Sequence, residues 1–220
     1  MGEHGQHRPL VIARLILAAA ALGAAVALAD PLPRPGLAPA AETRAAALIG
    51  AARSQIGVTT RYDPAYVALA FPGGDVARDR GVCTDVLIRA LRDAAALDLQ
   101  RAVHRDMTAR FADYPQNWGL RRPDRNIDHR RVPNLIALFD HLGARVADAP
   151  QPGDIVTVLL PGNLPHVMIV SDRTGPDGHP LVIHNIGRGT REEDALDRYP
   201  RTGHFRLTGP VLDRLRALDG

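Results

Sequence analysis

The chain has 220 residues, a formal net charge of +3 and only 4% aromatic residues. Its basic residues are all arginine and are scattered among nearly as many acidic ones, which excludes the clustered basic and aromatic surface of a nucleic-acid-binding protein. The absence of lysine excludes lysine-based catalysis, and the only serines, Ser54 and Ser171, lie outside any Gly-x-Ser-x-Gly motif, which argues against a serine hydrolase.

The N-terminus has the three parts of a secretory signal. A polar start that contains two arginines is followed by an uncharged apolar run over residues 15–29, which closes on Ala27-Leu28-Ala29 with small residues at the cleavage positions. A membrane anchor that stays in place is the alternative, but the run is shorter than the roughly 20 residues that a spanning helix needs. We therefore expect export, with no permanent membrane span once the signal is removed.

The rest of the chain is large enough to fold around a core of its own. We expect a periplasmic or cell-wall-associated protein. Its predicted segments are a signal peptide at residues 1–29, a leader rich in Pro and Ala at residues 30–41, and a folded domain at residues 42–210.

Helical periodicity dominates the first half of this domain, and β-rich runs dominate the second. Apolar spacing predicts helices over residues 42–55, 86–96, 104–114 and 133–142, with a loop rich in Gly, Pro and Asp over residues 58–81. Short β-rich runs separated by turn sequences predict strands over residues 154–160, 166–171, 181–185 and 204–207. Helices followed by an antiparallel meander are typical of an α+β fold.

Cys83 is the single cysteine and lies where a predicted helix begins. An exported chain with one cysteine has no internal disulfide, which leaves an intermolecular disulfide, a buried inert thiol or a reactive thiol. The free N–H groups and the dipole of a helix N-terminus favour the thiolate, and the same N–H groups can hold an oxyanion. We therefore predict that Cys83 is a nucleophile, and we interpret the nearby Asp85 as a solvated acid of the first helical turn.

Two histidines on neighbouring predicted strands are candidates for the base and its partner. If Ser171 pairs with His179 in a hairpin, His166 falls opposite His184, with Cβ atoms about 5 Å apart on one face of the sheet. A nucleophilic cysteine needs a base, and the base needs an orienting group. The alternative is that each is an ordinary strand histidine with a satisfied hydrogen bond.

A metal site is a further alternative for the histidines. Its ligands would be His166, His184 and His204 with either Cys83 or Asp154, but the compact ligand spacings of zinc sites are missing. We therefore expect neither a metal nor another cofactor, and we interpret Asp154 as part of a turn and strand start.

Four motifs in this order resemble the NlpC-type papain-like cell-wall peptidases: Cys83-Thr84-Asp85-Val86, Pro152-Gly153-Asp154-Ile155-Val156, His166-Val167-Met168-Ile169-Val170 and Val182-Ile183-His184-Asn185. A closer resemblance is to domain-of-unknown-function family 1287. It is carried by Gly81-Val82-Cys83-Thr84-Asp85-Val86, the block from Asn126 to Asn134, and His184-Asn185-Ile186-Gly187, and it extends over roughly residues 44–207.

The resemblance implies a papain-like α+β domain in which N-terminal helices pack on an antiparallel β-meander. It makes Cys83 the nucleophile, His166 the general base and acid, and His184 the group that orients His166, with Asn185 as the alternative for that third role. Tyr62 matches a tyrosine near the oxyanion, although the usual Tyr-Gly-Gly spacing is missing.

The block from Asn126 to Asn134 is rich in charge. Its His129, Arg130 and Arg131 could bind a substrate carboxylate, or they could form a salt-bridged loop.

Together these inferences predict an exported cysteine hydrolase. Its substrate would be peptidoglycan or a peptide, with an amide bond in the stem peptides cleaved through an acyl-enzyme on Cys83. The alternatives are a non-catalytic cell-wall-binding or metal-binding module, and a thiol acyltransferase on the same fold.

Overall fold

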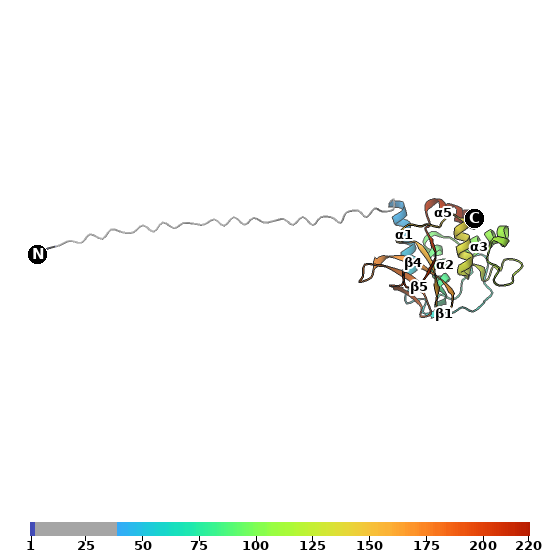
Figure 1. Ribbon diagram of the computed structural model, residues 1–220, viewed down its shortest axis with the longest axis horizontal. Coiled ribbons are helices and arrows are strands. Elements are labelled where there is room, and N and C mark those ends of the chain that lie inside the picture. Colours follow the sequence, from blue (N-terminus) through green and yellow to red (C-terminus); the bar gives the residue numbers. More distant parts are fainter. Residues whose placement is uncertain (3–38) are drawn as a thin grey trace. The chain divides into compact units, whose positions relative to one another are not determined.

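Four α-helices of the described chain precede the main sheet, and a fifth follows it (Figure 1). The computed structural model describes residues 1–2 and 39–220, so residues 3–38, with nearly all of the predicted signal peptide and leader, lie outside the described part. The helices are α1 (Pro39–Arg53), α2 (Cys83–Ala95), α3 (Leu99–Arg110), α4 (Val132–His141) and α5 (Gly209–Asp219), with short 3-10 turns η1 (Phe111–Asp113) and η2 (Asp128–Arg130). None of the described helices is long and apolar enough to cross a membrane.

The main sheet has five antiparallel strands in the order β6-β5-β4-β3-β7. They are β3 (Ile155–Leu160), β4 (Leu164–Thr174), β5 (Pro180–Asn185), β6 (Thr190–Glu193) and β7 (Arg201–Phe205). Two shorter strands, β1 (Arg61–Tyr62) and β2 (Arg80–Gly81), pair in parallel within the predicted loop. The structure therefore confirms the α+β class with helices and an antiparallel sheet.

The two faces of the sheet are buried by different parts of the chain. Alternate residues of β4 such as Val167 and Ile169 belong to the main core, which the helices complete. The intervening residues Met168 and Val170 belong to a smaller core on the other face, together with Leu196 from the segment between β6 and β7. Both faces of β4 are thus buried, which explains why its residues from Val167 to Val170 are all apolar.

Helix α2 is the central helix, and its side chains are buried from Cys83 to Leu91. Its apolar residues recur at helical spacing, which explains why this segment folds as a core helix. Two charged residues, Asp85 and Arg89, are buried in the same helix. Asp85 pairs with Arg130, and Arg89 pairs with Asp75.

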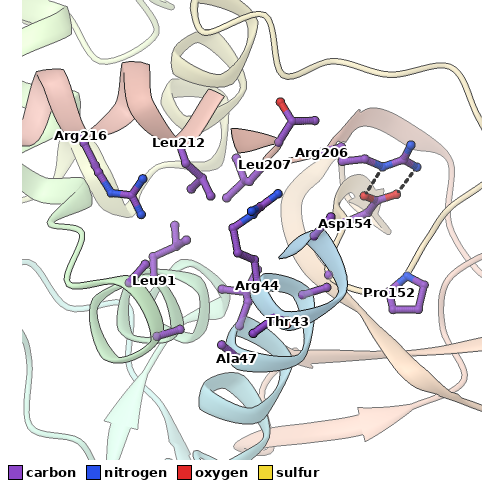
Figure 2. A pocket seen from close by; sticks show the side chains of 17 residues that line it. Thr43, Arg44, Ala47, Leu91, Pro152, Asp154, Arg206, Leu207, Leu212 and Arg216 are labelled. Atoms are coloured by element: carbon purple, nitrogen blue, oxygen red, sulfur yellow. Dashed lines mark hydrogen bonds and ion pairs between the residues drawn. The ribbon is translucent and has the colours of Figure 1, made fainter. Parts of the chain in front are cut away.

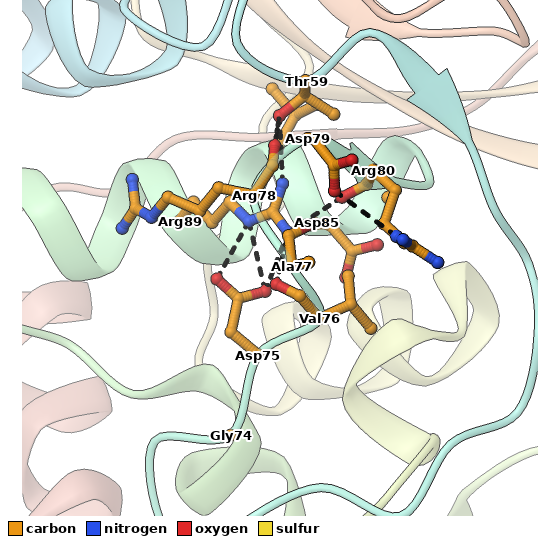
Figure 3. Close-up of polar contacts among 12 residues, drawn as sticks. Thr59, Gly74, Asp75, Val76, Ala77, Arg78, Asp79, Arg80, Asp85 and Arg89 are labelled. Carbon is orange, nitrogen blue, oxygen red and sulfur yellow. Dashed lines mark hydrogen bonds and ion pairs between the residues drawn. The ribbon is translucent and has the colours of Figure 1, made fainter.

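Arg89 is fully buried and organises the loop at residues 58–81 (Figure 3). Its guanidinium binds both carboxylate oxygens of Asp75 at 2.9–3.1 Å and donates to the Thr59 hydroxyl at 3.0 Å. It also donates to the carbonyl oxygens of Val76, Ala77 and Arg80. A loop with little regular structure is thereby fixed to the central helix.

Besides β1 and β2, a strand and a helix were not predicted. Strand β6 has the sequence Thr-Arg-Glu-Glu, which lacks the apolar alternation of a half-buried strand. Helix α5 begins at Gly209, and its Val211, Leu212 and Leu215 are buried in the main core. The hydrophobic core therefore continues past residue 210, where the predicted domain ended.

Replacing Arg89 by Ala should destabilise the protein by about 3 kcal/mol, because removing one partner of a buried ion pair leaves the other uncompensated. The free energy of unfolding in urea measures this change. Arg78→Ala is the matched control, because the Arg78–Asp93 pair is also bidentate but partly exposed, so it should cost about 1 kcal/mol or less. Equal losses in the two variants would contradict the role given to Arg89.

Candidate active site

Cys83 is the first residue of α2 and is only 5% exposed. Backbone N–H groups of Val167, Thr84 and Cys83 itself lie near its sulfur and favour its thiolate form. Two of these groups belong to the free N–H set of the helix start, and the third comes from strand β4. The thiol thus lies where the helix start meets the sheet, among donors that can hold negative charge.

Asp85 is buried and paired, which corrects the prediction of a solvated acid. Its carboxylate accepts from the Val82 N–H at 2.6 Å and forms a two-bond ion pair with Arg130, both bonds at 2.9 Å. A Cβ atom at Gly81 would lie 2.9 Å from the Asp85 carboxylate, so glycine is required for this close approach.

The ion pair with Asp85 also occupies the guanidinium of Arg130. Besides Asp85, its guanidinium donates to the carbonyl oxygens of Asp63 and Ala65, and its side chain is 2% exposed. The salt-bridged loop is therefore the arrangement present in the structure, and Arg130 has no free edge for a substrate carboxylate.

Burial raises the pKa of the Cys83 thiol to about 11. The negative charge of Asp85 acts in the same direction, whereas the three backbone N–H groups act against it. The cost of burying a thiolate outweighs the favourable helix start. Cys83 is therefore a neutral thiol at pH 7.

The structure brings His166 and His184 together in a buried hydrogen bond of 2.8 Å between His166 Nε2 and His184 Nδ1. Their rings meet edge to face, with centroids 5.0 Å apart. His184 Nε2 in turn contacts the Glu193 carboxylate at 3.0 Å. The result is a His-His-Glu chain, whose third member was missed because it lies in the unpredicted strand β6.

The predicted strand register is wrong by two residues. Strands β4 and β5 pair Ile169 with Ile183 and Val170 with Val182, so His166 is diagonal to His184 and not directly opposite it. A shift by two residues keeps every side chain on its face, whereas a shift by one would have separated the histidines. Diagonal neighbours on one face are still within reach of long or aromatic side chains.

Both histidines are held neutral by their surroundings. Burial lowers the pKa of His166 to about 3, and the adjacent His184 acts in the same direction. Burial also lowers the pKa of His184, although the Glu193 carboxylate opposes that shift. At pH 7 the resting pair of Cys83 and His166 is therefore a thiol and an imidazole, without a preformed ion pair.

No hydrogen bond joins Cys83 to either histidine among residues 39–220. The backbone group near the sulfur on this strand is the N–H of Val167, the residue that follows His166 in β4. Asn185 donates to the carbonyl oxygen of Gly81 at 3.0 Å, which ties the end of β5 to the segment that leads into α2. Asn185 therefore anchors the helix start, and His184 occupies the position next to His166 that was considered for Asn185.

A cleft of about 440 Å³ opens beside Cys83. Tyr62 lines it, and burial raises the pKa of this tyrosine to about 12. The thiolate that Cys83 forms only at such high pH and the Asp85 carboxylate act in the same direction. The guanidinium of Arg131 lies 4.0 Å from the ring centroid of Trp118, and both residues also line the cleft. Other lining residues are Pro64, Val82, Asn117, Ile127, Arg130, Val132, Pro133, Asn163 and Pro165.

His129 is buried away from this cleft. It is 2% exposed, and its Nδ1 has no hydrogen-bond partner among the described residues. Burial, aided by the nearby charges of Arg130 and Arg92, lowers its pKa to about 3. The structure thus places His129 in the core and not among the residues that line the cleft.

The metal site considered as an alternative is not assembled. His204 contacts Asp154 at 2.7 Å, and the same carboxylate pairs with Arg206, which makes Asp154 a structural residue at the start of β3 as predicted. The described part of the chain contains no group of three or more His, Cys, Asp or Glu side chains arranged to hold a metal ion.

A second cavity, of about 310 Å³, lies between α1, the end of α2 and the start of α5 (Figure 2). Arg44 extends from α1 into it beside Leu91 and Leu212, and Arg206 pairs with Asp154 at its edge. Cys83 and the histidine pair do not line it, so it is separate from the candidate active site.

Comparisons with known proteins cover most of this domain. The family described as Domain of unknown function (DUF1287) matches residues 49–207, a range that includes Cys83, His166, His184 and Glu193. The uncharacterized protein YijF of Escherichia coli (strain K12) is 53% identical over 165 residues, which cover 73% of this chain and 80% of that protein.

Alkylation of Cys83 by iodoacetamide should be slow at pH 7 and should rise about tenfold per pH unit up to pH 10, because the thiolate fraction follows the raised pKa. The thiol is the only one in the chain, so incorporation measured by mass reports this residue alone. The same chain in urea is the control, with a pKa near 8.5. A rate plateau between pH 5 and 7 in the folded protein would instead indicate a preformed thiolate.

His129→Gln should make the protein less sensitive to acid. The folded pKa of His129 lies below its unfolded value, so the unfolded chain binds more protons and stability is lost as pH falls from 6.5 towards 3. Between pH 6 and 4 the slope of unfolding free energy against pH should be smaller in the variant, by up to about 1.4 kcal/mol per unit. Identical slopes in urea titrations would show that His129 takes up protons equally in the folded and unfolded protein and would contradict the lowered pKa.

Proposed function

The chain belongs to the DUF1287 family, and from that starting point we propose that it is an exported cysteine hydrolase with a papain-like, NlpC-type fold. It cleaves an amide bond in peptidoglycan stem peptides. The observation that carries the proposal is the position of the single cysteine, at a helix start beside a cleft, with backbone N–H groups near its sulfur. One of these N–H groups belongs to Val167, which directly follows His166, the first member of the buried histidine pair.

The first step couples proton transfer from Cys83 to attack on the substrate. The S–H bond of Cys83 breaks as its proton moves to Nδ1 of His166, the ring nitrogen that is not engaged with His184. Because both groups are neutral at rest, this transfer accompanies attack of the sulfur on the amide carbonyl carbon, as in a general-base mechanism.

The N–H groups of Cys83 and Thr84 are suited to hold the oxyanion of the tetrahedral intermediate. His166 then returns its proton to the leaving amine, which leaves an acyl group on Cys83. In the second half of the reaction His166 takes a proton from water and the hydroxide attacks the acyl carbon. The C–S bond then breaks, the acid product leaves, and His166 returns its proton to the sulfur to regenerate the thiol. The atoms balance as hydrolysis of one amide bond.

The chemistry of the cleft supports an acidic peptide as substrate. Its lining includes no Asp or Glu, and its Arg131 presents its guanidinium against Trp118 with a single ion-pair partner, Asp128. Such a surface favours a chain that carries carboxylates. Peptidoglycan stem peptides have this charge, and the N-terminal signal pattern supports export to the periplasm or cell wall.

The test is a digest of purified peptidoglycan with the protein and with Cys83→Ala, with new peptide termini read by mass spectrometry. The wild type should release defined products, and the loss in Cys83→Ala should exceed a thousandfold because the nucleophile is removed. His166→Ala should lose about as much, and the double variant no more than either single one, because the two residues act as a unit.

Arg78→Ala serves as the folded control that keeps full activity, because Arg78 lies outside the cleft. Circular dichroism establishes that each variant retains the fold. Absence of products from the folded wild type, or products that persist in Cys83→Ala, would overturn the proposed function.

A further inference from the structure

We infer that Glu193 is a positioning residue that fixes the direction of the hydrogen bonds between the two histidines and so makes Nδ1 of His166 the basic atom. The chemical consequence rests on the proposed function, whereas the hydrogen-bond direction follows from the geometry alone.

The direction is set from the carboxylate end of the chain. An ionised carboxylate only accepts hydrogen bonds, so the 3.0 Å contact with Glu193 requires the proton of His184 to be on Nε2. A neutral imidazole has one N–H and one lone pair, so Nδ1 of His184 is then an acceptor. The opposite tautomer would place a lone pair against the carboxylate.

The second bond follows from the first. Nδ1 of His184 accepts, so the 2.8 Å contact requires Nε2 of His166 to donate. In the neutral ring of His166 the lone pair is therefore on Nδ1. One carboxylate thus determines the tautomers of two successive histidines, in the way that an outer hydrogen-bond partner commonly fixes the ring nitrogen that carries the proton.

The sheet holds Glu193 in place for this contact. Strand β6 pairs Glu193 with Val182 and Arg191 with His184, so Glu193 is diagonal to His184 on the same face. The Glu193 side chain is 26% exposed, and the hydrogen bond from His184 is the one that its carboxylate accepts within residues 39–220. Arg198 lies close enough to His184 to disfavour its protonation, which also keeps that ring neutral.

The neighbouring Glu192 offers a matched comparison. It lies on the other face of β6, where it accepts hydrogen bonds from Arg53 and Arg173, and it contacts neither histidine. The two adjacent carboxylates therefore have different tasks. Glu192 fixes α1 to the sheet, and Glu193 acts on the histidine pair.

The catalytic consequence concerns the protonated intermediate. When Nδ1 of His166 takes the thiol proton, the new imidazolium keeps its Nε2–H bond to His184, whose own Nε2–H points at a negative charge. No second proton moves. The carboxylate stabilises the imidazolium through the intervening ring and holds both rings in the geometry that this step needs.

The tautomers can be read directly by nitrogen-15 NMR of the histidine rings in the purified Cys83→Ala protein. This variant keeps His166, His184 and Glu193 and lacks only the thiol. The expected result is Nε2–H on both His166 and His184. In the Glu193→Ala background His184 should lose its single tautomer, whereas the Glu192→Gln background should leave both tautomers unchanged.

Activity of the otherwise wild-type enzyme gives a second readout. Glu193→Ala should lower kcat by about 10-fold to 100-fold with little change in KM, as expected when an outer partner of a functional histidine is removed. Glu193→Gln should recover part of that loss, because its amide oxygen can still accept from His184.

An Nδ1–H tautomer on His184, or tautomers that do not respond to Glu193→Ala, would overturn the inference. The inferred tautomers in a folded protein that hydrolyses no peptidoglycan would support the inference and overturn the proposed function. The two failures are therefore distinguishable.

Discussion

The buried ion pair between Asp85 and Arg130 is the interaction on which the candidate site depends. It fixes the start of α2, because Asp85 also takes the N–H of Val82, and it fixes the loop beside Tyr62, because Arg130 holds the carbonyl oxygens of that loop. The Thr84 hydroxyl adds a bond to the carbonyl of Arg130. A buried pair of this kind adds little net stability over apolar residues, but losing one partner is costly, so the pair enforces one geometry.

Arg89 is a second buried charge, one turn further along α2 than Asp85. An apolar core helix can be displaced along or around its axis at modest cost, whereas a helix with two buried charges has few positions in which both are satisfied. Asp85 and Arg89 thus determine where the helix start lies relative to β4. The position of the Cys83 sulfur beside the Val167 N–H follows from that arrangement.

Burial has the largest effect on the pKa values of Cys83 and His166. A helix start and backbone donors favour a thiolate, yet the pKa of Cys83 is raised and that of His166 is lowered, because both side chains are almost completely removed from water. In the proposed reaction, charge separation is therefore confined to the moment when the substrate is attacked. The chain from His166 through His184 to Glu193 would then compensate the positive charge that develops on the imidazole.

The sequence by itself determined the α+β class, most of the elements and the two-residue periodicity that keeps His166 and His184 on one face, because these follow from local patterns of apolar residues. Tertiary structure decided the register, the burial of Asp85 and His129, and the addition of Glu193, because these depend on contacts between distant segments. Strand β6 is the clearest case: its polar sequence carries no strand pattern, and only pairing with β5 places Glu193 beside His184.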